Sequence, residues 1–361
     1  MAVYLVLENG MVFKGQNFGA QGDVIGEVVF TTGMTGYLET LTDPSYHGQI
    51  VIQTFPLIGN YGIIASDFES KSIGPKAYIT KYPCQNPSNF RSEGNLETFL
   101  HERGITGLCG IDTRAVTKII REHGVMNGKI TSQKPTGDDI EKIRAHKLKN
   151  PVLQVTSGEK SLHKSETSKF TVALFDFGAK ENIRRELLLR GCDVWTFPSS
   201  CTADEILNCA PSGIMLSNGP GDPTENKETI ENIKILMKKD IPMFGICLGH
   251  QLMALACGFG TRKLKYGHRG ANQPVKDTQS GKVYITSQNH GYEVISESIS
   301  DGVADEWFFN VNDRSCEGII YKNSPAFSVQ FHPEACGGPK DTAFIFDRFI
   351  SMMGDCANAT R

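Results

Sequence analysis

From Phe170 onward, short apolar runs alternate with segments in which apolar residues recur every three or four positions. The runs predict β-strands and the segments between them predict amphipathic helices, one of which has Ile230, Ile233 and Met237 on one face. This alternation is typical of a parallel sheet covered by helices on both faces. The predicted strands are residues 171–177, 192–197, 213–217 and 241–246, followed by mostly strands over 282–330 and a closing helix over 342–352. We therefore predict an α/β fold with a C-terminal doubly wound, mostly parallel sheet.

The first part of the chain has a different pattern. A helix is predicted over residues 113–123, where Val116, Ile119 and Ile120 share one face. Strand-like runs precede it at residues 3–7, 27–32, 49–55 and 77–81. Residues 131–169 are rich in lysine, serine and acidic side chains with little apolar periodicity, which is typical of a boundary between domains. We predict a smaller mixed α/β domain over 1–168 and the doubly wound domain over 170–361.

Residues 245–251, GICLGHQ, end one apolar run and open another, so Cys247 is predicted at a sharp turn from a strand into a helix. Such an elbow exposes its central side chain and directs the first helix amides at whatever that side chain attacks. The pattern alone fits a core-filling thiol as well. The segment FHPE at 331–334 supplies a base, His332, and a carboxylate, Glu334, which project the same way because Pro333 keeps the chain extended. We predict Cys247, His332 and Glu334 as nucleophile, base and orienting acid, whereas His268 and His290 lack a carboxylate placed in this way.

Hydrogen-bond donors for an oxyanion are expected close to the elbow. The Leu248 N–H follows the nucleophile directly, and the glycine-rich segment SNGPGDP at 217–223, with Gly219 and Gly221, follows the third strand. Taken alone, that segment fits a plain turn equally well. Gln251 lies one helical turn after Cys247, so its amide could hold a polar substrate group or form a structural hydrogen bond.

Composition narrows the class of protein. With 361 residues, 39% hydrophobic and 21% charged positions and a net charge of −3, the chain is neither a polybasic nucleic-acid binder nor a disordered acidic tail. Its ten cysteines include no C-x-x-C pair and no zinc spacing, so we expect free thiols in the cytoplasm and no metal. The N-terminus has no basic leader, and the uncharged stretch 241–260 contains a proline and four glycines, so no signal peptide and no membrane span are expected.

The motifs around Cys247, Gly219 and His332 resemble those of class I, triad-type glutamine amidotransferases. In the first domain, TGMTGY at 32–37, LTDPSY at 41–46 and IDTR at 111–114 resemble the small, glutamine-hydrolysing subunits of carbamoyl-phosphate synthetase. The resemblance implies that Cys247 attacks the glutamine side-chain amide, that a glutamyl thioester is hydrolysed to glutamate, and that ammonia passes to a large subunit. It also implies a glutamine site formed by Ser45, Gly219, Gly221, Leu248, Gln251, Asn289, Gly291 and Tyr292, the last being phenylalanine in many relatives.

The same resemblance implies a heterodimer in which the first domain contacts the synthetase partner. The large subunit binds ATP with magnesium, and bicarbonate, and makes carbamoyl phosphate for arginine and pyrimidine synthesis, while this chain carries no cofactor. A partner is also expected on chemical grounds, because free ammonia is mostly protonated in neutral water and this chain has no nucleotide-binding motif. Three alternatives remain: an amidotransferase for anthranilate or guanylate synthesis, which would not need the long first domain, a free-standing cysteine hydrolase, and a non-catalytic scaffold.

Overall fold

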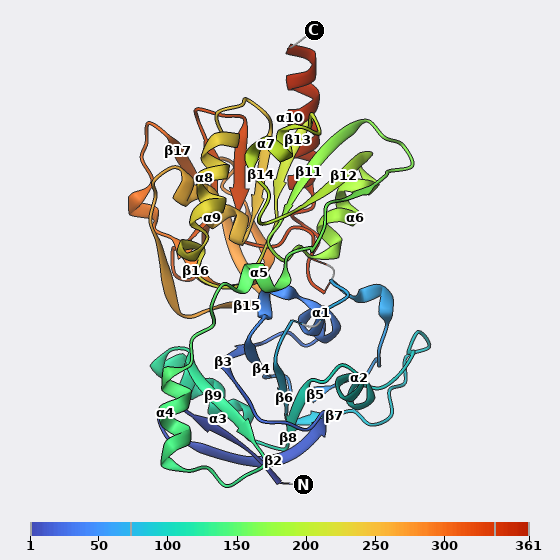
Figure 1. Ribbon diagram of the computed structural model, residues 1–361, viewed down its shortest axis with the longest axis vertical. Coiled ribbons are helices and arrows are strands. Elements are labelled where there is room, and N and C mark those ends of the chain that lie inside the picture. Colours follow the sequence, from blue (N-terminus) through green and yellow to red (C-terminus); the bar gives the residue numbers. More distant parts are fainter. Residues whose placement is uncertain (1, 73, 336, 360–361) are drawn as a thin grey trace. The chain divides into compact units, whose positions relative to one another are not determined.

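The computed structural model describes residues 2–72, 74–335 and 337–359, and the chain forms two compact units that divide between Lys149 and Asn150 (Figure 1). This division lies earlier than the boundary predicted at residues 168–170. Strand β10 (Ser161–His163) pairs antiparallel with β12 (Cys192–Pro198), so it belongs to the second unit. A three-residue edge strand carries too short a pattern to be distinguished from a linker.

The first unit is built around a closed β-barrel with the strand order β1-β2-β8-β6-β4-β3-β9. Strands near 3–7, 27–32, 49–55 and 77–81 were predicted and are present, but closure of the barrel was not predicted. The closing strands β2 and β9 carry mixed polar sequences, VFKGQNFG and MNGKIT, which give no clear strand signal. The barrel strands are β1 (Ala2–Leu7), β2 (Val12–Gly19), β3 (Val24–Thr31), β4 (Gln49–Gln53), β6 (Ala77–Thr80), β8 (Thr106–Cys109) and β9 (Met126–Thr131).

Helix α3 (Thr113–His123) has the bounds that the apolar periodicity predicts. Its Val116 and Ile120 are buried in one core cluster with barrel residues, and Asp112 caps its first turn by accepting the Ala115 N–H. The unit further contains α1 (Tyr37–Thr42), η1 (Pro44–Tyr46), η2 (Ala65–Asp67), α2 (Leu96–Glu102), α4 (Gly137–Ala145) and the paired short strands β5 (Leu57–Ile58) and β7 (Tyr82–Pro83). The predicted mixed α/β character of this unit is confirmed.

The second unit is a single mixed sheet with the strand order β10-β12-β11-β13-β14-β19-β18-β16-β15-β17. Its strands β12, β11, β13, β14 and β19 run parallel to their neighbours in that order. The bounds of these central strands are β11 (Phe170–Asp176), β13 (Gly213–Leu216), β14 (Met243–Ile246) and β19 (Ala326–Val329). Helices cover both faces, as predicted for a doubly wound sheet.

Alternate residues of the parallel strands pack into two separate cores. Phe175 and Leu216 join the core of α7, α8 and α9, whereas Leu174 and Met215 join the core of α6 and α10. The helices are α6 (Glu181–Leu189), α7 (Ala203–Leu207), α8 (Lys227–Leu236), α9 (Leu248–Ala256) and α10 (Phe344–Ala359), together with α5 (Pro151–Val155), η3 (Pro223–Glu225) and η4 (Ser296–Ser298). None of the described helices combines the length and the apolar character needed to span a membrane.

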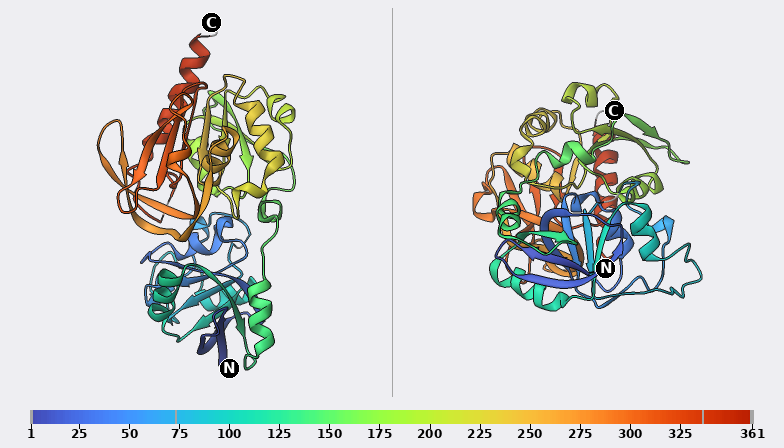
Figure 2. Two further views of the ribbon diagram at one scale, coloured as in Figure 1. Left: turned by 90° about the vertical axis from the view of Figure 1, so that its left-hand side faces the viewer. Right: turned by 60° about the horizontal axis from the view of Figure 1, so that its bottom comes forward.

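The antiparallel half of the sheet is dominated by a long hairpin of β15 (Thr261–Asp277) and β16 (Val283–Val294), drawn in orange in Figure 2. Strands β17 (Ala304–Asn310) and β18 (Cys316–Tyr321) complete this half, and β18 pairs with β19. The prediction of mostly strands over 282–330 is confirmed, while β15 was not predicted. The carboxyl ends of β13, β14 and β19 lie along one edge of the sheet, which is where ligands bind in open α/β folds.

The core below this edge depends on Phe244 in β14, whose ring stacks on Phe327 with centroids 4.7 Å apart and also contacts Phe346 and Phe349. We predict that Phe244→Ala destabilises the second unit by about 3–5 kcal/mol, because it leaves a cavity in a fully buried cluster. Denaturant unfolding followed by circular dichroism measures this loss. Leu189→Ala, at a position that is 78% exposed, is the control and should change stability by less than about 0.5 kcal/mol.

Candidate active site

Cys247 lies at the turn between β14 and α9 with φ 53° and ψ −101°, outside the main allowed regions for a residue with a side chain. Backbone hydrogen bonds hold this elbow on both sides, because the Cys247 N–H donates to the Val329 oxygen at 2.9 Å and the Gly249 N–H donates to the Ser217 oxygen at 3.0 Å. The Leu248 N–H is the first amide of α9 and therefore has no acceptor within the helix. The predicted strand-to-helix elbow is confirmed.

Two glycines permit the close packing around the elbow. A Cβ atom on Gly249 would approach the Leu216 Cβ to 2.8 Å, and one on Gly219 would approach the Leu248 Cδ2 to 2.7 Å. Both distances are shorter than normal contacts, so any side chain at these positions would push the elbow away from the end of β13. The Gly219 contact also brings the glycine-rich loop, with Gly221 at φ 92°, against the start of α9, as predicted.

His332 and Glu334 form a buried hydrogen bond of 2.7 Å between Nδ1 and Oε1, in the arrangement that the sequence predicts. His332 follows Val329 by three residues, and Val329 is paired with Ile246, so the imidazole and the elbow lie at the ends of neighbouring parallel strands. Among the described residues, the His332 Nε2 atom has no hydrogen-bond partner. An imidazole with Nδ1–H bound to a carboxylate presents an unprotonated Nε2, which is the form a base requires.

Lys180 lies beside the His332 and Glu334 pair, a position that the sequence did not predict. It lies in the loop after β11, is 8% exposed, and places Nζ 3.6 Å from the Glu334 Oε1 atom. Burial alone raises the pKa of Glu334, but the charges of His332 and Lys180 and the His332 hydrogen bond together hold it below its ordinary value. Glu334 is therefore a carboxylate at neutral pH. The available signal was the position of Lys180 at the carboxyl end of a predicted parallel strand.

Asn289, Gly291 and Tyr292 lie in β16, within the region that the sequence predicts to be mostly strands. The Cys247 Sγ lies 3.7 Å from the Asn289 oxygen, and Cys247 is only 2% exposed. The structure thus brings the Asn289 carbonyl close to the Cys247 thiol, which its surroundings cover.

Gln251 is buried on α9, and its Nε2 donates to the Tyr292 oxygen and to the Gln330 Oε1, each at 2.9 Å. Of the two interpretations of this residue, the structure displays the structural hydrogen bond, which ties α9 to β16. Ser45 lies in the first unit, in η1, where it is 8% exposed and its N–H donates to the Asp43 Oδ1 at 2.8 Å. Its part in the glutamine site is a prediction from the resemblance.

A second ionic network, buried except for the exposed Asp313, lies on β15, β16 and β18. His268 on β15 places Nε2 2.8 Å from the Asp313 Oδ2 and Nδ1 3.4 Å from the Glu317 Oε1. Burial alone lowers the pKa of His268, but its contacts with Asp313 and Glu317 outweigh burial and raise it to about 9. Gln288 joins Glu317 to His290 through contacts of 2.9 and 3.1 Å, so the charges of this network lie directly under the strand that carries Asn289.

His268, His290 and Glu317 are also the described residues that could most readily share a metal ion, with one ligand atom each within 4.8 Å of one another. The His290 Nδ1 atom bonds the Tyr292 oxygen at 2.8 Å, and burial with the neighbouring charge of His268 keeps the pKa of His290 well below its ordinary value. We interpret the trio as a hydrogen-bonded ionic network, because Asp313, Gln288 and the Tyr292 carbonyl already engage its polar atoms. The nine cysteines that the structure describes are free thiols, and Cys336 lies outside the described residues.

The chain is similar to known proteins over almost its whole length. A sequence model of the class-I glutamine amidotransferases matches residues 173–352, and a model of the carbamoyl-phosphate synthase small chain, CPSase domain, matches residues 5–130. A carbamoyl phosphate synthase small chain from Fusobacterium nucleatum is 50% identical over 350 residues, 96% of each chain. The pyrimidine-specific small chain from Bacillus subtilis is 51% identical over 352 residues, 97% of this chain and 95% of its own. A solved glutamine amidotransferase from Thermotoga maritima is 18% identical, covering 55% of this chain and 86% of its own, with a TM-score of 0.38.

The second unit is therefore a class I glutamine amidotransferase domain, with its elbow cysteine and its histidine and glutamate pair at the expected edge of the sheet. The relatives match the first unit and the second unit together, over almost the whole chain. The chain belongs to the carbamoyl phosphate synthase small chain family.

The raised pKa of His268 leads to a prediction about pH. A histidine with a folded pKa of about 9 and an ordinary value of 6.5 contributes stability that is complete below pH 6.5 and lost as pH rises through 9. Asp313→Asn removes one of its two carboxylate partners, so the variant should melt a few degrees lower at pH 6.5, and the gap to the parent protein should close toward pH 9.5. Thermal melts across this range measure it. A gap that is the same at every pH would contradict the charged state of His268.

Proposed function

We propose that this protein, as the glutaminase subunit of a carbamoyl phosphate synthase, uses Cys247 as its nucleophile, His332 as its base and Glu334 as the acid that orients the base. The observation that carries the proposal is the Nδ1 to Oε1 hydrogen bond of 2.7 Å, which leaves the His332 Nε2 without a protein partner, beside the strand that ends in the elbow. A thiol needs such a base because an ordinary cysteine is only a few per cent thiolate at neutral pH.

In the first half of the reaction, His332 Nε2 takes the thiol proton and the Cys247 sulfur attacks the side-chain carbonyl carbon of glutamine. The carbonyl oxygen becomes an oxyanion, which the Leu248 N–H and an amide of the loop at Gly219 stabilise. Each such donor is worth about 2.7–4 kcal/mol in the transition state. The imidazolium then returns its proton to the leaving nitrogen, the C–N bond breaks, and ammonia departs from a glutamyl thioester.

In the second half, the same imidazole takes a proton from water, which attacks the thioester. The C–S bond breaks, Cys247 recovers a proton from His332, and glutamate leaves. Glu334 stays ionised throughout because Lys180 and His332 lower its pKa, so it can hold the imidazolium that forms twice in each cycle.

Residues around Cys247, His332 and Glu334 bind glutamine in this proposal. We infer that Asn289, Gly291 and Tyr292 contact the substrate from β16, with Gln251 fixing the Tyr292 carbonyl, and that Ser45 of the first unit, Gly219, Gly221 and Leu248 complete the site. Removing the Asn289 carbonyl from Sγ is the local change that binding requires. Tyr292 adds a hydroxyl where many relatives carry phenylalanine, so its main-chain oxygen is the part that the proposal uses.

Ammonia formed here must be used by another subunit. We propose a large synthetase subunit that binds ATP with magnesium, and bicarbonate, as the acceptor, with the first unit contributing to the contact and with no cofactor on this chain. The matches of relatives across both units favour this assembly over an amidotransferase that serves another synthase.

Replacing the nucleophile tests the chemistry. Cys247→Ala should abolish glutamine-dependent carbamoyl phosphate synthesis in the complex, while added ammonium still supports it, because only the source of nitrogen is lost. Coupled assays with each nitrogen donor measure the two rates. Cys201→Ala, a half-buried thiol elsewhere in the unit, is the control and should retain both activities. Glutamine-dependent synthesis at the parental rate in Cys247→Ala would favour the scaffold interpretation.

Replacing the orienting acid tests the triad. Glu334→Gln keeps the shape but removes the charge that stabilises the imidazolium, so kcat for glutamine hydrolysis should fall about 10²- to 10⁴-fold with a smaller change in KM. Glu181→Gln, which removes a partly exposed carboxylate paired with Arg184 on nearby α6, should leave kcat within about twofold. Equal losses in the two variants would argue against a specific role for Glu334.

A further inference from the structure

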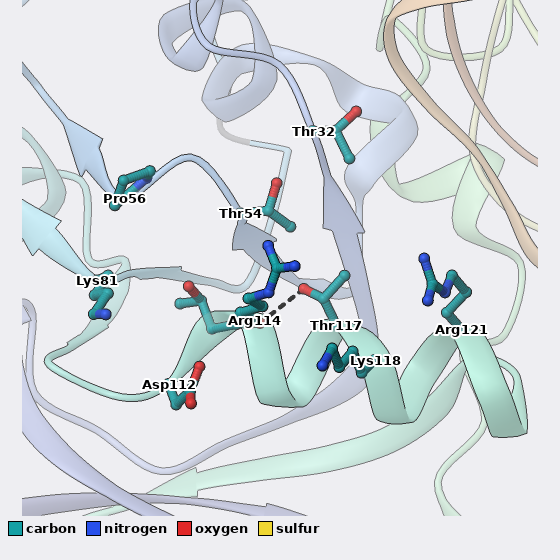
Figure 3. A pocket seen from close by; sticks show the side chains of 10 residues that line it. Thr32, Thr54, Pro56, Lys81, Asp112, Arg114, Thr117, Lys118 and Arg121 are labelled. Carbon is teal, nitrogen blue, oxygen red and sulfur yellow. Dashed lines mark hydrogen bonds between the residues drawn. The ribbon is translucent and has the colours of Figure 1, made fainter.

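The first unit contains a hollow of about 440 Å³ with a strongly positive lining (Figure 3). Lys81, Arg114, Lys118 and Arg121 supply four positive charges, and Asp112 supplies the single negative one. Threonines make up most of the remaining lining residues. We call this hollow the cationic pocket, and it stands out because the chain as a whole has a net charge of −3.

Three of these cations follow one face of α3. Arg114, Lys118 and Arg121 are separated by four and three residues, the spacing of helix neighbours, while the opposite face buries Val116 and Ile120 in the barrel core. Figure 3 shows the three side chains along the helix, with Thr32 and Thr54 drawn from other parts of the lining. All three are exposed, and none forms an ion pair with another residue in the described ranges.

This arrangement costs stability in the isolated chain. Like charges at this spacing repel by about 0.2–0.5 kcal/mol per pair, and Arg114 in the first helical turn also opposes the helix dipole. Asp112 is the one acid in the lining, so four cations share a single carboxylate there. An anion supplied from outside would offset the remaining positive charge.

The shape of the site favours an extended anion over a single phosphate. Asp112 already caps the amino end of α3 by accepting the Ala115 N–H at 3.0 Å, so its carboxylate stands where a phosphate would bind at the start of the helix. The cations extend over the eight residues from Arg114 to Arg121, whose seven helical steps span about 10 Å. Three or four residues of extended chain span that distance, and alternate acidic residues would each meet one cation.

We propose that the cationic pocket docks an acidic segment of the synthetase subunit and steers the association of the two subunits. This inference rests on the proposed assembly with a large subunit and gives that assembly a defined contact. Charge contacts of this kind act mostly on the association rate and on its dependence on salt.

The test compares binding of the full-length protein to its cognate large subunit. The triple variant Arg114→Glu, Lys118→Glu, Arg121→Glu should raise Kd about 100-fold or more at 0.1 M salt, mostly through slower association, and should weaken less with added salt than the parent. Surface-immobilised binding kinetics at several salt concentrations measure both effects. The matched control reverses three exposed lysines of the same unit outside the pocket, Lys134→Glu, Lys142→Glu, Lys147→Glu, and should change Kd less than about threefold.

Glutamine hydrolysis by each variant alone serves as the check on folding and should stay at the parental rate. The neutral variant Arg114→Gln, Lys118→Gln, Arg121→Gln should give an intermediate Kd, and it replaces the reversed variant if that one misfolds. An unchanged Kd, or an equal loss in the lysine control, overturns the proposal. Binding of inorganic phosphate that the triple variant loses while assembly persists would overturn it too, because the pocket would then be a small-anion site.

The outcome is separable from that of the proposed chemistry. Cys247→Ala tests hydrolysis and should leave Kd for the large subunit unchanged, whereas the pocket variants test assembly and should leave hydrolysis unchanged. Loss of assembly in the triple variant supports the docking proposal even if Cys247→Ala were to retain activity.

Discussion

The backbone of Cys247 is the constraint on which the active site depends. Holding a residue with a side chain at φ 53° and ψ −101° costs about 1–3 kcal/mol, and only over-determined surroundings sustain it. Those surroundings are the hydrogen bonds to Val329 and Ser217 on the two neighbouring strands and the contact of Gly249 with Leu216. Because the parallel strands and both cores fix these contacts, the sheet determines where the sulfur and the first amide of α9 point.

Two ionic networks lie in the second unit, and each stabilises a different buried charge. His332 and Lys180 hold the buried carboxylate of Glu334 in its charged form, whereas His268 is a buried cation between Asp313 and Glu317. Buried charges are stable only when they are paired. Each network therefore permits few alternative positions of its side chains. We infer that the network around His268 holds β16 in the position that places the Asn289 carbonyl against the Cys247 Sγ atom. The network around Glu334 holds the His332 imidazole in one orientation.

Local sequence patterns predicted the parts of the fold and site that depend on neighbours along the chain. The elbow around Cys247, the His332 and Glu334 pair and the bounds of α3 all follow from spacing within a few residues. Lys180 and the network around His268 could not be predicted because their partners lie far away in sequence. Barrel closure was missed for a related reason, since the polar strands β2 and β9 are identified as strands only by the partners with which they pair.

The division of the chain into two units separates two electrostatic demands that conflict within one site. A glutaminase centre needs a few charges of fixed sign that are shielded from water. Any additional charge nearby would shift the pKa of the base. A surface that captures a partner quickly needs many like charges in water, which act over about 10 Å at moderate salt. Arg114, Lys118 and Arg121 lie on a unit whose core is separate from the two cores that position Cys247, so substitutions there leave the packing around Cys247 in place.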